Sequence, residues 1–229
     1  MLVGVAKTGV SGMAILVVPL IAMVFPAKES VGALLPMLIA GDVLAVIYYR
    51  RHAQWRQLVK LIPGVATGML IGGMFLSQLD NESMRIFLGV FVLFLLMIEG
   101  IARYLKLNEF KKLRSFAVLV GVMAGFGTTV GNSAGPIMGI YFIMMGFDKK
   151  QLMGSGAWFF LIVNTSKLPI FIYHEMLGVD TLQFFAYMLP FVVLGTFLGR
   201  KLLTVLSQKI FNHLVLIFAG LSSLWLLLF

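Results

Sequence analysis

One stretch of the sequence decides the fold, and it reads Gly121-Val-Met-Ala-Gly-Phe-Gly-Thr-Thr-Val-Gly-Asn-Ser-Ala-Gly-Pro-Ile-Met-Gly-Ile-Tyr141. It lies inside a long apolar segment, 115–146, yet it is rich in Gly, Thr, Asn, Ser and Pro. Backbone that leaves the helix at membrane depth is tolerated only where it lines a cavity or is buried in protein. The stretch therefore predicts a broken helix that forms half of a substrate site.

The composition of the chain is that of a helical membrane protein. Of its 229 residues, 60% are hydrophobic and 12% are charged, and runs of about 20 apolar residues are long enough to cross a bilayer. The net charge of +9 comes from basic residues in short loops between these runs. Cytoplasmic loops of membrane proteins have this character, so the charge does not indicate nucleic-acid binding. The chain has no cysteine, which excludes disulfides and thiolate chemistry, and we expect neither a cofactor nor a metal site.

An internal repeat relates the two halves of the chain. Eight apolar segments are visible, at 2–25, 31–49, 58–77, 84–102, 115–146, 152–173, 182–199 and 210–229. A shift of 122 aligns Gly9 with Gly131 and Asp42 with Asn164, and a shift of 127 then aligns Pro63 with Pro190. The alignment predicts two repeats, 1–107 and 115–229, within a single compact membrane domain. Each repeat consists of a broken Gly-rich segment followed by three plain helices.

The distribution of basic residues favours an inverted arrangement of these repeats. If all eight segments cross once, as eight plain spans, Lys and Arg divide almost evenly between the two faces. If segment 115–146 instead dips into the membrane and returns, most basic residues share one face, as the positive-inside rule requires. The residues on this face are Arg50, Arg51, Arg56, Lys60, Arg103, Lys106, Lys111, Lys112, Arg114, Lys149, Lys150, Arg200, Lys201 and Lys209. Three full spans per repeat then invert the halves, a common transporter plan. The charges leave open whether the segment 1–25 crosses or re-enters.

Three charged side chains lie inside apolar segments: Lys7, Asp42 and Lys167. Each costs about 2.5–3.5 kcal/mol on insertion scales, so intramembrane ionisable groups are functional candidates. Together with freed N–H groups at the two breaks, they predict an anion site near mid-membrane. The predicted binding residues are Lys7, Thr8, Ser11, Thr128, Thr129, Asn132, Ser133, Asn164 and Lys167. Asp42 is a separate candidate for proton coupling.

The same residues are open to other interpretations. Lys167 can pair with Asp42 to hold two helices together, or extend to the membrane surface. Gly131-Asn-Ser-Ala-Gly135 matches the G-x-S-x-G motif, which makes an intramembrane serine protease using Ser133 an alternative. Against it, nothing before the motif reads as a strand, and the histidines lie near segment ends. The polar groups can also line an anion channel. We expect a transporter and not an enzyme.

The sequence resembles the TauE/SafE sulfite exporter family, also called the TSUP family. The matching features are Gly9-Val-Ser-Gly12 leading to Pro19, Gly125-Phe-Gly127 through Gly131-Asn-Ser-Ala-Gly-Pro136, Trp55-Arg56 before Pro63, and the run Pro190, Gly195 and Gly199. Asn132 and Ser133 stand where the family's usual pattern has glycines. The resemblance implies transport of small sulfur-containing anions, such as sulfite, thiosulfate, sulfonates or sulfoacetate, across a bacterial inner membrane. It does not specify direction, the coupling ion (protons or sodium) or the oligomeric state.

Overall fold

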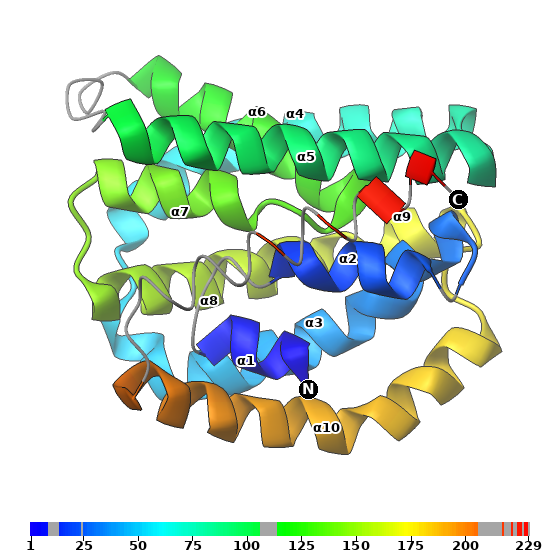
Figure 1. The fold of residues 1–229 in the computed structure, drawn as a ribbon. Coiled ribbons are helices and arrows are strands. Elements are labelled where there is room, and N and C mark those ends of the chain that lie inside the picture. The colour runs from blue at the N-terminus through cyan, green and yellow to red at the C-terminus, as the bar shows by residue number, and fades with distance from the viewer. Residues whose placement is uncertain are drawn as a thin grey trace.

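The computed structural model describes residues 1–8, 14–23, 25–105 and 114–205, with a few positions beyond them (217, 221, 224–225 and 227–228) (Figure 1). Regular structure within these ranges is helical, which confirms the predicted all-helical class. The helices are α1 Leu2–Thr8, α2 Ala14–Ala22, α3 Ala27–Tyr49, α4 Trp55–Gln78, α5 Asn81–Leu105, α6 Arg114–Gly131, α7 Gly135–Met144, α8 Lys149–Ser166, α9 Leu168–Tyr173 and α10 Val179–Val205, with a 3-10 turn η1 at Arg50–His52. Most of the predicted segment 210–229 lies outside the described residues.

Four stretches of helix are long and apolar enough to cross a membrane. They are Ala27–His52, Trp55–Gln78, Lys150–Tyr173 and Val179–Lys201, of 23 to 26 residues each. At 1.5 Å per residue these lengths give about 34–39 Å, enough for a hydrocarbon core of about 30 Å. Large apolar side chains such as Leu70, Met74 and Phe191 stay exposed on their outer faces. Such surfaces suit lipid contact and not water.

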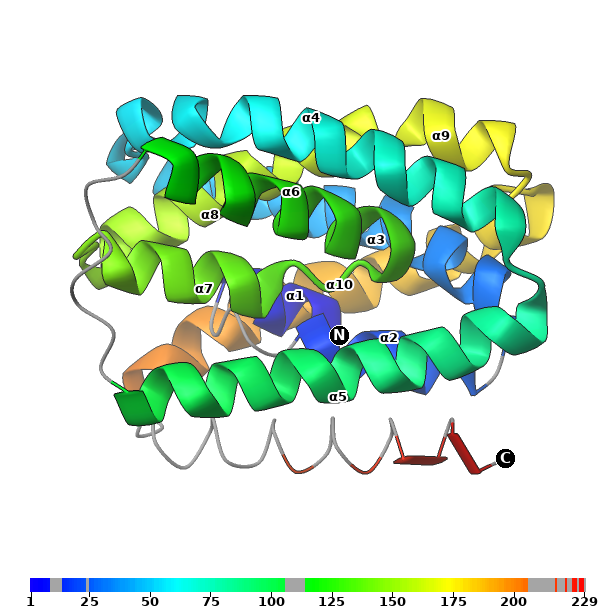
Figure 2. The same cartoon turned by 90° about the horizontal axis from the view of Figure 1, so that it is seen from above.

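The predicted break in segment 115–146 is confirmed between α6 and α7. Helix α6 ends at Gly131 and α7 begins at Gly135. Asn132 has a φ of 51°, a left-handed conformation that ends a helix and that asparagine tolerates better than most residues. Helix α6 runs inward from one end of the bundle, and α7 returns to that same end (Figure 2). The chain therefore does not form the eight uninterrupted spans of the alternative arrangement.

Helix α6 packs along α4 through glycines that bring the two backbones together. A Cβ atom at Gly125 would overlap the carbonyl oxygen of Val65, and one at Gly68 would overlap that of Val122. Close approach of this kind stabilises helix pairs in membranes, where dispersion contacts replace the hydrophobic effect as the driving force. The pairing holds α6, and with it the break at its end, against the rest of the bundle.

Helix α1 packs along α10 in the same manner. A Cβ atom at Gly4 would overlap the carbonyl oxygen of Val192, and one at Gly195 would overlap that of Met1. The predicted shift of 127 relates these α10 positions to their counterparts on α4. Gly4 and Gly125 are 121 positions apart, one fewer than the 122 predicted for the broken segments.

The segment 152–173, predicted as one plain helix, lies within the continuous helical stretch Lys150–Tyr173, which confirms the prediction, and a single turn residue, Lys167, divides this stretch into α8 and α9. Helix α8 ends at Ser166 and α9 begins at Leu168. Pro169 lies in the first turn of α9 and cannot donate a hydrogen bond to the carbonyl of Thr165, and its ring crowds that turn. The backbone N–H of Lys167 still reaches the carbonyl of Val163 at 3.1 Å, so α9 continues from α8 with a local change in winding.

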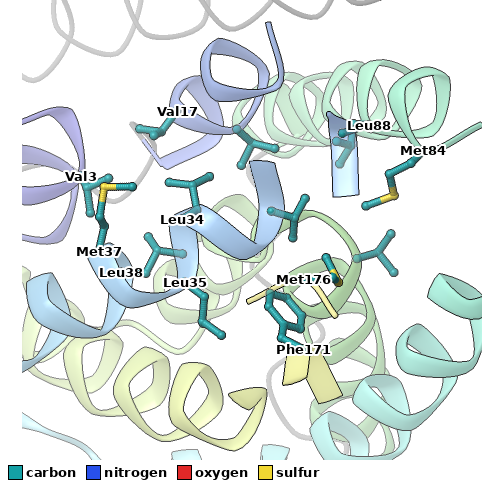
Figure 3. Close-up of a cluster of buried hydrophobic side chains, with 14 of the residues drawn as sticks. Val3, Val17, Leu34, Leu35, Met37, Leu38, Met84, Leu88, Phe171 and Met176 are labelled. Carbon is teal, nitrogen blue, oxygen red and sulfur yellow. The ribbon is translucent and has the colours of Figure 1, made fainter. Parts of the chain in front are cut away.

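A cluster of buried apolar side chains fixes α3 among its neighbours (Figure 3). Leu34 and Leu35 of α3, Leu88 of α5 and Phe171 of α9 are almost fully buried in it. Val130, near the end of α6, belongs to the same cluster. The break between α6 and α7 therefore begins directly beside a close-packed core, which holds its position.

The starts of α4 and α8 lie at the same end of the bundle. The backbone N–H of Gln54 donates to Ser155 Oγ at 2.9 Å, and the rings of Trp55 and Trp158 lie 5.2 Å apart. Lys149 opens α8, which places it at the end where α3 passes into α4. The sequence analysis placed the loops before α4 and α8 on the same basic face, and the structure agrees because both helices start at one end of the bundle. That this end lies on the cytoplasmic side of the membrane stays a prediction.

Candidate functional site

A cavity of about 40 Å³ lies between the α6–α7 break and helices α1, α3 and α8. Five of the predicted site residues line it: Lys7, Asp42, Thr128, Asn132 and Asn164. The lining residues Asp42, Thr128, Asn132 and Asn164 are buried, whereas Leu152 and Met153, near the start of α8, are partly exposed. The cavity therefore extends from the centre of the bundle toward the end where α8 begins.

A chain of polar contacts joins α1, α3 and α8 at the inner end of this cavity. Lys7 Nζ lies 2.7 Å from Asp42 Oδ1, and Asn164 Nδ2 donates to Asp42 Oδ2 at 2.7 Å. Asp42 is fully buried, and a buried carboxylate is stable only when paired and hydrogen-bonded. The ion-pair partner of Asp42 is thus Lys7, and the pairing of Asp42 with Lys167 considered from the sequence is not the one formed.

Lys167 instead binds the break itself. Its Nζ donates to the Thr128 carbonyl at 2.9 Å, to Thr128 Oγ1 at 3.1 Å and to Asn132 Oδ1 at 2.5 Å. Asn132 Nδ2 in turn donates to the Val31 carbonyl of α3 at 2.9 Å. Lys167 is fully buried and does not line the cavity. It fixes the two residues, Thr128 and Asn132, that do.

Two of the predicted hydroxyls lie at helix contacts and not on the cavity wall. Thr129 Oγ1 donates to the Gly125 carbonyl at 2.8 Å, within α6. Thr8 Oγ1 lies 3.0 Å from the Gly4 carbonyl and 2.9 Å from the Thr196 carbonyl of α10. Both hydroxyls have carbonyl partners where α6 meets α4 and where α1 meets α10. Their geometry is that of helix packing, and a role in binding stays a prediction.

The serine alternative gains no support from the structure. Ser133 Oγ donates to the Gly131 carbonyl at 2.7 Å and lies off the cavity wall. Among the residues that the structure describes, Ser133 has no histidine partner that could take its proton. Ser11, the other predicted serine, lies outside the described residues.

Sequence reasoning missed the apolar and glycine part of the wall. The ring of Phe160 lies under Lys7, whose Nζ is 4.3 Å from the ring centroid, a geometry that stabilises a cation. Gly139 and Gly156 also line the cavity, and a Cβ atom at Gly139 would meet no atom within 4 Å. In the sequence, the glycines of α7 and α8 were the only indication of this part of the wall. Glycines at helix contacts produce the same pattern, so the pattern does not identify a cavity.

The comparison with known families decides the identity of the chain. The family described as Sulfite exporter TauE/SafE matches residues 1–226. The chain belongs to the TauE/SafE family. No curated protein and no solved structure matches it. Family membership confirms the resemblance seen in the sequence and makes the chain a multi-pass membrane protein of a transporter family. Its work is accordingly transport and not an enzymatic reaction.

The charges around the cavity of this TauE/SafE protein suit an anion. Two lysines, Lys7 in the ion pair with Asp42 and Lys167 at the break, stand against the single carboxylate of Asp42. Helix α7 begins at Gly135 on the cavity wall, and the first N–H groups of a helix have no intrahelical partner and carry partial positive charge. Among the described residues, no group of three or more His, Cys, Asp or Glu could hold a metal ion.

Proposed function

We propose that this TauE/SafE protein is a secondary transporter that moves a small sulfur-containing anion across the bacterial inner membrane. Sulfite, thiosulfate, a sulfonate and sulfoacetate are the candidate substrates. The observation that carries the proposal is the cavity, whose wall includes Lys7, Thr128 and Gly135, the first residue of α7. All three groups offer hydrogen-bond donors to one small space, which is what an oxyanion requires.

The size of the cavity supports a substrate of a few heavy atoms. Its volume of about 40 Å³ compares with about 10–15 Å³, on the same kind of measure, for the space that one water molecule needs. An ion of the size of sulfite fits this space, whereas a peptide does not. The proposal therefore favours transport over the protease alternative.

Two inverted repeats, 1–107 and 115–229, give the proposed transporter its mechanism. In support, the contacts of α1 with α10 repeat those of α6 with α4, so each broken segment packs on a helix of the other repeat. Asp42 and Asn164, which the sequence repeat aligns, also contact each other directly. Residues related by a two-fold axis touch their own counterparts at that axis. The cavity then lies at the repeat interface, where transporters of this plan bind substrate.

Asp42 is the proposed proton-coupling group. It is buried on the cavity wall and is held to Lys7 by an ion pair of 2.7 Å. Protonation of Asp42 would end its ion pair with Lys7 and leave the Lys7 ammonium free for the anion. A proton and the anion would then move together. Coupling to sodium is the alternative, and transport that follows a sodium gradient at constant pH would favour it.

The test is sulfite flux into proteoliposomes that contain the purified protein. We expect saturable uptake with counterflow of unlabelled sulfite, and loss of uptake in Lys7→Met. Lys60→Met makes the same chemical change on an exposed side chain of α4 and should transport normally. Single-channel currents without counterflow would indicate the anion-channel alternative. Equal uptake by empty vesicles and vesicles with protein would refute transport of sulfite.

A further inference from the structure

The side-chain amide of Asn164 is held in one orientation, which leaves its oxygen without a partner. Asn164 Nδ2 donates to Asp42 Oδ2 at 2.7 Å. Turning the amide over would place its oxygen against that carboxylate oxygen, with two acceptors at hydrogen-bond distance. Asn164 Oδ1 is buried and receives no hydrogen bond from any described residue.

The residue that carries the unpaired oxygen lies on the cavity wall. Asn164 is 1% exposed and lines the cavity beside Lys7 and Asp42. Buried polar atoms in folded proteins almost always have a hydrogen-bond partner, and no protein group fills this role for Asn164 Oδ1 within the described ranges. A group that enters the cavity can supply the missing hydrogen bond, and both a water molecule and a bound anion with a polar hydrogen meet this need.

The other polar groups of the wall are donors, hydrogen-bonded groups or, for Lys7 and Asp42, members of an ion pair. The Lys7 ammonium has three hydrogens to donate and forms an ion pair of 2.7 Å with Asp42 Oδ1. Thr128 Oγ1 accepts from Lys167 at 3.1 Å, which leaves its own hydrogen for a ligand. Asn132 accepts from Lys167 through its oxygen and donates to a carbonyl of α3 through its nitrogen. In the part of the chain that is described, the wall thus presents several donors, the Asp42 oxygen that is ion-paired with Lys7, and one amide oxygen without any partner.

We propose that the site selects monoanions that carry a polar hydrogen, with Asn164 Oδ1 as the acceptor of that hydrogen. The inference rests on the proposed anion transport and adds the protonation state of the substrate. For sulfite it selects hydrogensulfite, whose S–OH group donates to Asn164 while its other oxygens accept from Lys7 and Thr128. The sulfite dianion and simple alkanesulfonates have no hydrogen to donate and would leave Asn164 Oδ1 unpaired.

Sulfamate and methanesulfonate form a matched pair of probes for this selection. Both are tetrahedral monoanions at neutral pH and have nearly the same size, but sulfamate carries an NH₂ group where methanesulfonate carries CH₃. Their affinities are measured by calorimetry on the purified full chain in detergent and by competition against sulfite uptake. We expect sulfamate to bind at least about tenfold more tightly, because an analogue that lacks the donor leaves a buried acceptor unpaired.

Two variants assign the preference to its source. Asn164→Leu removes the acceptor, so the ratio of the two affinities should fall to about one. Thr128→Val removes a donor from the same wall, so both anions should bind more weakly while their ratio stays as in the wild type. The wild-type ratio decides the question by itself where Asn164→Leu does not fold.

Three results would overturn the inference. Equal affinities in the wild type, or tighter binding of methanesulfonate, would refute it and leave the anion site standing. A preference for sulfamate that survives Asn164→Leu would assign the selection to another group. Failure of both anions to bind or to compete with sulfite would refute the anion site and the inference with it.

Discussion

The ion pair between Lys7 and Asp42 gives the sharpest energetic prediction. Its atoms lie 2.7 Å apart, and the two side chains are 8% and 0% exposed. At an effective dielectric constant of about 20 the Coulomb attraction at this distance is about 6 kcal/mol, much of which is offset by the cost of burying both charges. Removing one partner leaves the other buried and unpaired. Lys7→Met and Asp42→Asn should therefore each destabilise the fold by about 3–5 kcal/mol.

The double variant separates the ion pair from general packing. Lys7→Met with Asp42→Asn leaves no unpaired charge, so its cost should fall below the sum of the single costs by at least about 2 kcal/mol. Reversible unfolding in mixed micelles measures all three variants. The pair of Arg85 with Glu82 is the matched control, since it also spans 2.7 Å but is 24% and 70% exposed. Its coupling should be at most about 1 kcal/mol. Additivity of the Lys7 and Asp42 costs to within about 0.5 kcal/mol would refute the reasoning.

Three further predictions concern topology, packing and pH. Reporter tags at Arg56 and at Lys149 should both be cytoplasmic, and a Lys149 tag on the outer side would contradict the inverted arrangement. Gly64→Val should abolish folded protein in size-exclusion chromatography, because a Cβ atom there would overlap the backbone of α6; a folded variant would show that α4 and α6 can separate. The hydrogen bond from the Ser83 backbone lowers the pKa of Asp80. The ionised carboxylate therefore stabilises the fold above the pKa of Asp80 in the unfolded chain, and this stabilisation is lost as pH falls through its pKa in the folded protein. Asp80→Ala should thus be less stable than the wild type at neutral pH in thermal unfolding and equal to it in acid, whereas a difference independent of pH would refute this.

Most of the helical framework follows from the sequence because the bilayer leaves few choices. Apolar runs of span length predict helices, and a run with Gly, Thr, Asn and Pro at its centre predicts a break, which the structure has at Asn132. The single turn residue at Lys167, within the correctly predicted helix 152–173, was not predicted. Pro169 lies near the end of the apolar run 152–173. A proline at this place can end a helix, distort it locally or leave it straight, and the sequence alone does not distinguish these outcomes.

The members of the site were easier to predict than their contacts. An ionisable residue in an apolar run indicates a functional site, so the sequence identified Lys7, Asp42 and Lys167 as candidates. Helical spacing shows which residues share a face, but it does not show which helix that face meets. Spacing could not show that Asp42 forms its ion pair with Lys7 of α1, or that Lys167 forms hydrogen bonds with the break between α6 and α7. Gly139 and Phe160 also line the cavity, but a glycine or a phenylalanine in an apolar run is equally compatible with ordinary helix packing.

The central claim is that a small anion binds in the cavity, and sulfite binding to Gly139→Ala tests it most directly. A Cβ atom at Gly139 would meet no atom within 4 Å, so the added methyl group enters the cavity without strain and takes roughly the space of one water molecule. Gly178→Ala is the matched control, because a Cβ atom there is equally free and the residue is exposed and off the cavity wall. Calorimetry should give equal sulfite affinity for the wild type and Gly178→Ala and an affinity at least about tenfold lower for Gly139→Ala, a difference of about 1.4 kcal/mol. Equal affinity in all three proteins would contradict the account.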